Sequence, residues 1–480
     1  MMTEQADDEI SLTPAKMRLT ALIVASALFM QNIDSTVIAT ALPAMAKTFH
    51  ADPLHMSVAL TSYLLSLAVF IPASGWFADK FGARTVFRAA IALFTIGSVL
   101  CGFSTSLGAL VASRILQGIG GAMMVPVGRL LLLRSVRKTD MIAATSWLTM
   151  PALIGPIVGP PLGGLIVTYA SWPWIFDINV PIGVIGILAV TWFIEDVRDP
   201  IAAGRLDLGG LAYSGFAMAA LMIAIETVGR SLLPLWATIA AFAGGLLACL
   251  LYARHAKRVD HPVLDFTLMR IPTFANSVIA GSFFRVAVGA TPFLLPLMLQ
   301  LDFGKSAAAS GSITFTAAIG ALALKPLALP LLRRFGFRST MIWTAIGASL
   351  FTVACAAFRP FWPIIWLDAV LLIGGIFRSL QFTAYNTIAY ADIPRARMSA
   401  ATSLYSTMQQ ITLTLGVAIG AAALEFSTSL SRHIQPSLND FSVAFVVVGL
   451  IGAVAIPVCW RLHEDAGEEL SGHHPIPPHH

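Results

Sequence analysis

Long apolar runs recur along almost all of this 480-residue chain and constrain its fold more than any other feature. A helix needs about 20 mostly apolar residues to cross a bilayer. The candidate spans are 19–42, 54–77, 86–103, 107–131, 141–169, 174–194, 208–227, 233–253, 272–299, 307–332, 340–358, 361–390, 400–426 and 441–460. Only 11% of the residues are charged, whereas soluble domains carry roughly 25%. The sequence therefore predicts an all-α polytopic membrane protein with 14 transmembrane helices.

The basic residues predict the orientation of these spans. If both termini are cytoplasmic, most of the 30 Lys and Arg residues fall in cytoplasmic segments or at cytoplasmic helix ends. The outer side then carries only Lys47, Arg230, Lys305, Arg359 and Arg432. Cytoplasmic loops of membrane proteins have such an excess of Lys and Arg. We therefore expect a multi-pass protein of the bacterial inner membrane with both termini in the cytoplasm.

An internal repeat divides the chain. The loop KFGAR at 80–84 reappears as RFGFR at 334–338, and Pro72 and Pro326 share the offset of 254 residues. Duplicated helical bundles are typical of transporters. The expected units are a cytoplasmic N-terminal segment (1–18), an N-terminal six-helix bundle (19–194), a linker with two extra transmembrane helices (195–270), a C-terminal six-helix bundle (271–462) and a disordered cytoplasmic tail (463–480).

Four motifs carry a family resemblance. Residues 75–84, GWFADKFGAR, resemble the major facilitator signature between helices 2 and 3. Residues 110–121, LVASRILQGIGG, resemble the helix 4 motif of proton-coupled members, and 155–164, GPIVGPPLGG, the helix 5 motif of antiporters. Residues 34–43, DSTVIATALP, are similar to the helix 1 motif of the fourteen-helix drug exporters. Together they resemble the EmrB/QacA-type drug:proton antiporters, particularly the MdtD-like branch.

This resemblance implies the major facilitator fold, with two pseudo-symmetric six-helix bundles plus two additional helices. It implies efflux by alternating access, driven by the proton motive force without a cofactor. It assigns a cytoplasmic gate to Gly75, Asp79, Lys80 and Arg84, with Lys80 and Arg84 as partners of Asp79. It assigns the antiporter motif to Gly155, Pro156, Gly159, Pro160, Gly163 and Gly164. Two residues depart from the pattern, Ala83 in place of a basic residue and Asp177 in place of an apolar one.

Asp34 and Arg114 are ionisable residues inside predicted spans, where such groups are costly and usually functional. A rise of 1.5 Å per residue puts both at nearly the same depth, and the family places helices 1 and 4 side by side. We expect the two side chains to meet. Because Arg does not titrate in proteins, Asp34 would carry the proton. The alternative is a static ion pair that only joins two helices.

The second half offers another charge pair and a polar helix face. Arg285 and Asp368 have matching estimated depths and are expected to pair, either at the cavity or merely to neutralise each other. Lys325 could instead extend to the cytoplasmic interface, and the face of Arg378 could serve helix–helix hydrogen bonding. The substrate cavity candidates are Gln31, Asn32, Gln117, Lys325, Arg378, Gln381, Tyr385 and Asn386.

These residues predict a proton-coupled antiporter that exports amphipathic small molecules. A net basic cavity favours neutral or anionic substrates. An exchanger or symporter for an organic anion is the alternative. No nucleophile–base pair, metal-ligand cluster or phosphate-binding loop is apparent in the sequence, so we expect neither an enzyme nor a metal site. The expected partners are substrate, protons and membrane lipid, without nucleic acid, and the protein is expected to be a monomer.

Overall fold

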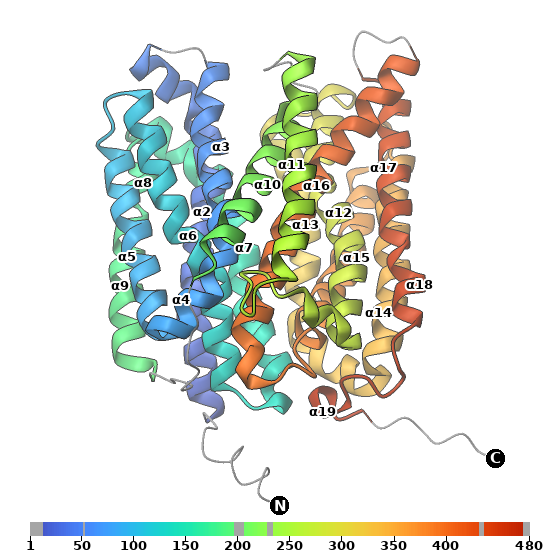
Figure 1. Cartoon of the computed structure of the whole chain (residues 1–480). Coiled ribbons are helices and arrows are strands. Elements are labelled where there is room, and N and C mark those ends of the chain that lie inside the picture. The colour runs from blue at the N-terminus through green and yellow to red at the C-terminus, as the bar shows by residue number, and fades with distance from the viewer. Residues whose placement is uncertain (1–12, 51–52, 196–205, 228–233, 432–435, 474–480) are drawn as a thin grey trace, which may run out of the picture.

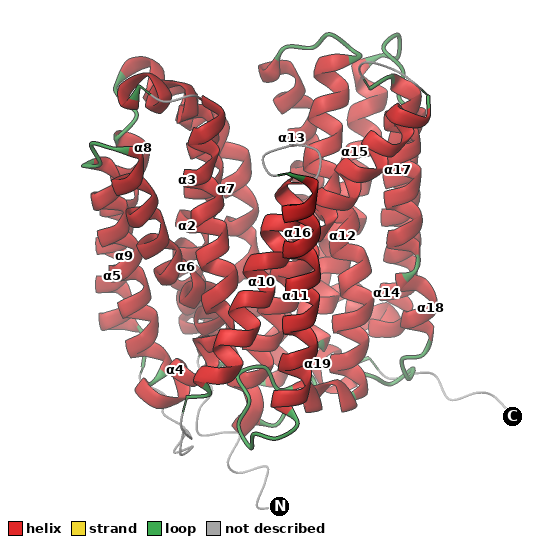
Figure 2. Cartoon of the chain, turned by 45° about the horizontal axis from the view of Figure 1, so that its top comes forward, coloured by secondary structure: helices red, strands yellow, loops and turns green. Residues whose placement is uncertain are grey.

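The structure, a computed structural model, describes residues 13–50, 53–195, 206–227, 234–431 and 436–473. These residues form helices and loops, without a strand among them (Figure 2). Predictions that concern residues 1–12, residues 474–480, Arg230 and Arg432 lie outside the described part of the chain. The all-helical fold class is confirmed for the residues described.

The N-terminal half runs from α2 to α9. Its helices are α2 (Pro14–Phe49), α3 (Pro53–Phe70), α4 (Ser74–Phe81), α5 (Ala83–Gly102), α6 (Leu107–Ser135), α7 (Met141–Tyr169), α8 (Trp174–Asp177) and α9 (Asn179–Phe193). The 3₁₀ turn Ile71–Ala73 joins α3 to α4. α6 begins where the hydroxyl of Ser106 accepts a hydrogen bond from the backbone N–H of Ala109, which satisfies one of its free N-terminal donors.

Two further helices separate the halves, α10 (Leu208–Thr227) and α11 (Leu235–Ala256). They lie across the junction in Figure 1, and Met218 and Met222 of α10 cluster with Ala68 of α3 and Ile411 of α16. The C-terminal half contains α12 (Pro272–Leu301), α13 (Ala307–Leu324), α14 (Ala328–Ala354), α15 (Ile364–Ile388), α16 (Met398–Leu430), α17 (Leu438–Ala453) and α18 (Ala455–Trp460), and α19 (Glu468–Ser471) follows.

The internal repeat is visible in the backbone. Gly82 and Gly336, which are 254 residues apart in the sequence, have positive φ angles of 84° and 70°. Both form the turn after a membrane-crossing helix, where a side chain would be strained. Pro72 and Pro326 lie in 3₁₀ turns at corresponding positions, Ile71–Ala73 and Lys325–Leu327. The two halves therefore repeat the same local deviations from α-helix.

Eleven helical segments in the described residues are long and apolar enough to span a membrane. One of them, Ala309–Ala357, has 49 residues and is broken at Gly336, so it contains two helices. The chain is thus a multi-pass helical protein, and the count of fourteen spans stays a prediction.

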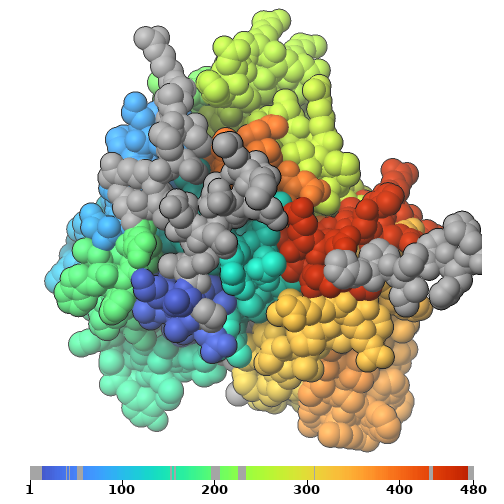
Figure 3. Space-filling view, turned by 90° about the horizontal axis from the view of Figure 1, so that it is seen from below, coloured from blue at the N-terminus to red at the C-terminus, as the bar shows by residue number. Residues whose placement is uncertain are grey.

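The contacts between the halves lie on the side where the described chain begins and ends. The cross-half hydrogen bonds and ion pairs described are Ser399 to Asp79, Ser403 to the carbonyl of Pro72, Arg129 to Tyr390 and Gln409, Lys325 to Thr149, and Lys138 to Glu469. Seen from below, teal atoms near the start of α7 lie against the red C-terminal segment (Figure 3). We call this side the termini side.

Residues 463–473 differ from the disordered tail that we expected. They include α19, and the side chain of Leu470 is buried. Glu469 pairs with Lys138 of the N-terminal half at 2.6 Å, and Glu464 pairs with Arg338 of the C-terminal half. His473 Nδ1 lies 2.8 Å from the carbonyl oxygen of Arg333. This C-terminal segment therefore contacts both halves on the termini side.

Candidate functional site

A buried ion pair joins the helices that carry the two predicted coupling residues. Arg114 of α6 donates to Asp34 Oδ2 of α2 at 2.6 Å, and their side chains are only 0% and 1% exposed. Arg114 Nε also donates to the carbonyl of Ala59 on α3 at 3.2 Å. Its guanidinium lies 4.2 Å from the ring centroid of Tyr63. The structure therefore brings Asp34 and Arg114 together as their depths predict.

Neutral side chains complete the surroundings of this carboxylate. Gln117 Nε2 donates to Asp34 Oδ1 at 2.9 Å, and Asn179 Nδ2 donates to the same oxygen at 3.1 Å. Both amides also donate to the hydroxyl of Ser98, at 2.7 and 3.3 Å. Asp34 thus accepts hydrogen bonds from two other helices, from α6 through Arg114 and Gln117 and from α9 through Asn179. Gln117 was expected in the substrate cavity and instead binds Asp34.

Helix α7 packs tightly against the helix that carries Asp34. A Cβ added at Gly155 would lie 2.7 Å from Asn32 Cβ, and one added at Gly159 would lie 2.0 Å from Thr36 Oγ1. Small residues allow such close contact between membrane helices. Gly163 is buried, whereas a Cβ at Gly164 would meet no atom within 4 Å. The side chains of Pro156 and Pro160 lie outside the described part.

Gln31 and Asn32 precede Asp34 on α2. Asn32 Nδ2 donates to the backbone carbonyl of Leu28 at 2.8 Å, so its amide is held within its own helix. Gln31 Oε1 is buried without a hydrogen-bond partner. Gln31 therefore keeps a buried polar atom that no described residue uses.

The prediction that Arg285 and Asp368 form an ion pair is wrong. Arg285 donates to the hydroxyl of Tyr405, and Asp368 accepts from Thr316 at 2.8 Å. α12 has 30 residues, about 45 Å of helix, which exceeds a hydrocarbon core of about 30 Å. Arg285 is therefore about 24 Å from the end of α12 that lies away from the termini side, whereas Asp368 is about 6 Å from the corresponding end of α15. The sequence estimate measured the depth of Arg285 from one side of the membrane and that of Asp368 from the other, which hid this difference.

Lys325 does not extend to the membrane surface. It is 5% exposed, and its Nζ donates to Thr149 Oγ1 at 2.7 Å and Thr383 Oγ1 at 2.9 Å. Thr149 belongs to α7 of the N-terminal half, whereas Thr383 belongs to α15 of the C-terminal half. The buried amine therefore joins the two halves through hydroxyl groups, without a carboxylate among its described partners.

The polar face of α15 divides into two environments. Arg378 and Gln381 line a small cavity among α12, α14, α15 and α17. Tyr385 accepts a hydrogen bond from Gln381 at 3.1 Å and contacts Cys459 Sγ at 3.4 Å, and Asn386 donates to the carbonyl of Phe382 at 2.7 Å. Only the first two residues therefore face open space, and the others serve packing inside the C-terminal half.

Asp79, the acid of the predicted gate, has partners other than the expected Lys80 and Arg84. Asp79 pairs with Arg134 of α6 at 3.0 Å and accepts from Ser399 of α16 across the two halves. Arg84 instead donates to the carbonyl of Thr191, and Lys80 is exposed. Gly75 packs closely here, because a Cβ at that position would lie 2.8 Å from the carbonyl oxygen of Ser399.

Several residues of these sites were not predicted. Ser98, Asn179, Tyr63 and Ser399 are uncharged, and residues of these types are common in membrane helices. Asn179 was the most recognisable, since it is an amide at the start of an apolar helix. Asp177, beside it, lies 3.0 Å from the position of a Cβ at Gly102, away from Asp34.

The family model described as Major Facilitator Superfamily matches residues 24–290 and 277–476. The chain therefore belongs to the major facilitator superfamily and is a transporter rather than an enzyme. The first match covers the N-terminal half, α10, α11 and the start of α12, and the second covers the C-terminal half.

The relatives place it on the MdtD-like branch. MdtD of Salmonella dublin, named for multidrug resistance, is 38% identical over 435 residues, which are 91% of this chain and 92% of that protein. MdtD of Salmonella typhimurium has the same identity and coverage. The human organic anion transporter MFSD10 matches with a TM-score of 0.67 at 12% identity, over 93% of this chain and 100% of its own. The proton:xylose symporter XylE matches with a TM-score of 0.66 at 13% identity, over 95% and 98%. The two solved structures establish the fold alone.

Proposed function

We propose that this protein is a proton-coupled antiporter that exports amphipathic small molecules from a bacterial cell by alternating access. It would lie in the inner membrane with the termini side facing the cytoplasm, in agreement with its basic loops. The 38% identity to MdtD proteins, which are named for multidrug resistance, supports a drug or metabolite as the exported compound. The observation that carries the proposal is the buried Asp34–Arg114 pair.

The hydrogen bonds of Asp34 suggest how it would exchange a proton. Its two oxygens accept hydrogen bonds from Arg114, Gln117 and Asn179, and the guanidinium of Arg114 supplies the opposite charge. Protonation would remove the charge that holds Arg114 and would loosen α2 from α6. α2 packs on α7, and α7 contacts the C-terminal half through Thr149. A shift of α2 would therefore be transmitted through α7 to the junction between the two halves.

The proposal is tested by measuring proton movement in proteoliposomes with an internal pH-sensitive dye. Addition of ethidium or 1-naphthoate to the wild-type protein should drive a proton flux that falls to background in Asp34→Asn. Glu425→Gln is the control, because Glu425 is an exposed acid near the outer end of α16. A flux that persists in Asp34→Asn, or compound transport without any proton movement, would overturn the proposal.

An organic-anion exchanger remains the second candidate. Arg129, Arg285, Lys325 and Arg378 are cations in or beside the membrane-spanning helices for which the described residues provide no carboxylate partner. Exchange of one anion for another would move no protons, so the flux assay separates this candidate from antiport.

A further inference from the structure

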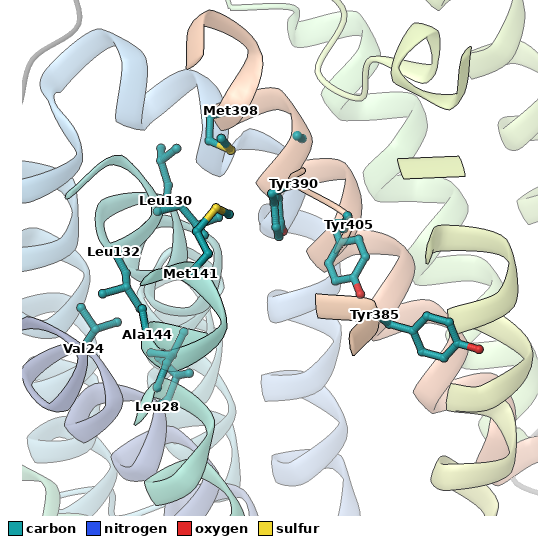
Figure 4. Close-up of a cluster of buried hydrophobic side chains, with 14 of the residues drawn as sticks. Val24, Leu28, Leu130, Leu132, Met141, Ala144, Tyr385, Tyr390, Met398 and Tyr405 are labelled. Atoms are coloured by element: carbon teal, nitrogen blue, oxygen red, sulfur yellow. The ribbon is translucent and has the colours of Figure 1, made fainter. Parts of the chain in front are cut away.

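Two arginines from opposite halves converge on one tyrosine ring. Arg129 of α6 is 7% exposed, and Arg285 of α12 is 0% exposed. Their guanidinium carbons lie 5.5 and 4.6 Å from the ring centroid of Tyr405 on α16. Figure 4 shows Tyr405 beside Tyr390, whose ring centroid is 5.6 Å away. Leu130 and Met141 of the N-terminal half are drawn in the same apolar cluster.

The donors of these two arginines are incompletely used. Arg285 donates to the Tyr405 hydroxyl, but its Nε and Nη1 are buried without hydrogen-bond partners. Arg129 makes two long hydrogen bonds, 3.5 Å to the Tyr390 hydroxyl and 3.4 Å to Gln409 Oε1. Neither forms an ion pair among the described residues. A buried donor without an acceptor destabilises the folded protein, and more so when the donor is charged.

Static packing does not account for this arrangement. Two cations that face one ring repel each other where the dielectric constant is low. The same protein neutralises Arg114, which is also 0% exposed, with the carboxylate of Asp34. An anion is the missing component, and a guanidinium matches the paired oxygens of a carboxylate, sulfonate or phosphate.

We propose that Arg129 and Arg285 form a two-armed site for the anionic group of a transported organic anion, with Tyr390 and Tyr405 as aromatic surfaces for its apolar body. This inference rests on the proposed export function and specifies its substrate class. When the halves separate on the termini side, Arg129 leaves with α6, while Arg285 and both tyrosines stay with the C-terminal half. An anion that binds between Arg129 and Arg285 contacts both halves at once. Its binding therefore favours the conformation in which the halves are close together.

The test uses three compounds that share one ring system and differ in charge: 1-naphthoate, the neutral 1-naphthamide and the cationic 1-naphthylmethylammonium. Binding to the purified full chain in detergent is measured by isothermal titration calorimetry. Wild type should bind 1-naphthoate about 10-fold or more tightly than 1-naphthamide, since hydrogen bonds from a guanidinium to a charged acceptor are stronger than those to a neutral one. The cation should bind most weakly.

Arg129→Gln and Arg285→Gln should each reduce 1-naphthoate affinity to near that of 1-naphthamide. Lys257→Gln, which removes an exposed cation after α11, should leave the preference unchanged. Arg129→Lys and Arg285→Lys retain the charge, so they should retain part of the preference even if a Gln variant fails to fold. Equal affinity for acid and amide in wild type, absence of binding, or a preference that survives both Gln substitutions would overturn the site.

This experiment needs no proton gradient. Selective binding of 1-naphthoate without proton flux would contradict antiport and leave the anion site intact. Proton flux driven by ethidium, together with equal affinity for 1-naphthoate and 1-naphthamide, would support antiport and contradict the anion site.

Discussion

Lys325 combines a buried amine with two hydroxyl partners at the junction of the halves. A lysine charge taken out of water is strongly disfavoured unless it is paired. Thr149 and Thr383 provide hydrogen bonds but no opposite charge. The closed contact on the termini side therefore includes a residue that opposes closure, and opening would hydrate it.

Lys325→Met should stabilise this closed contact. The substitution removes an unpaired polar group and keeps a flexible side chain of similar length, so unfolding should require about 1–3 kcal/mol more free energy. Thermal unfolding in detergent measures the gain, and transport should slow because the closed state is held longer. Lys257→Met is the matched control at an exposed position. A lower stability of Lys325→Met would show that the amine holds the halves together.

Individual residues differ in how far the sequence predicts them. Asp34 and Arg114 were found because charges inside apolar runs are conspicuous and because their depths agree. The depth of Asp368 relative to Arg285 was estimated wrongly, because α12 is longer than the membrane core and the apolar pattern does not reveal this extra length. The predicted span 107–131 ends before Arg134, yet α6 extends to Ser135, and both Arg129 and Arg134 are buried. Charge alone does not distinguish a loop from a helix that protrudes beyond the membrane core.

At the scale of elements, the contact between α2 and α7 links the carboxylate to the glycine motif. Gly155 and Gly159 both face α2, at Asn32 and Thr36, on either side of the turn that carries Asp34. Glycines four residues apart on a membrane helix indicate a close contact with another helix. They do not identify the partner helix, because glycine spacing describes one surface and not the surface opposite.

Gly159→Val should separate these helices. Its Cβ would lie 2.0 Å from Thr36 Oγ1, and overpacking of this kind costs about 1–3 kcal/mol. Thermal stability should fall, and proton-coupled transport should fall with it because Asp34 moves away from Arg114. Gly164→Val lies on the same helix with no atom within 4 Å of its Cβ, so it should leave both measurements unchanged. Equal effects of the two substitutions would contradict this account of α7.

At the scale of the whole molecule, closure on the termini side depends on short polar contacts and on the C-terminal segment. Ser403, which donates to the carbonyl of Pro72 in the other half, is completely buried there. The C-terminal segment adds an ion pair to each half and buries Leu470. We had expected residues 463–480 to be disordered because they are polar and rich in Pro and His. One leucine and two glutamates are too weak a sequence pattern to predict that this segment packs against both halves.

Deletion of residues 464–480 should favour conformations that are open on the termini side. The lost burial of Leu470 alone is worth about 1.5–3 kcal/mol. A cysteine introduced as Ser403→Cys should therefore react about tenfold faster with a membrane-impermeant maleimide. Deletion of 474–480 alone keeps Leu470, Glu464 and Glu469 and is the control. Unchanged reactivity in the longer deletion would mean that the segment follows closure without stabilising it.

The burial of Asp34 also bears on electrical insulation. Asp34 is only 2% exposed, and Arg114, Gln117 and Asn179 contact its carboxylate oxygens, so the protein separates this carboxylate from both aqueous phases. A proton cannot hop onto it from either aqueous phase while this conformation lasts. Molecules that are not transporting substrate would therefore not leak protons across the membrane. A cell could hold many of them without losing its membrane potential.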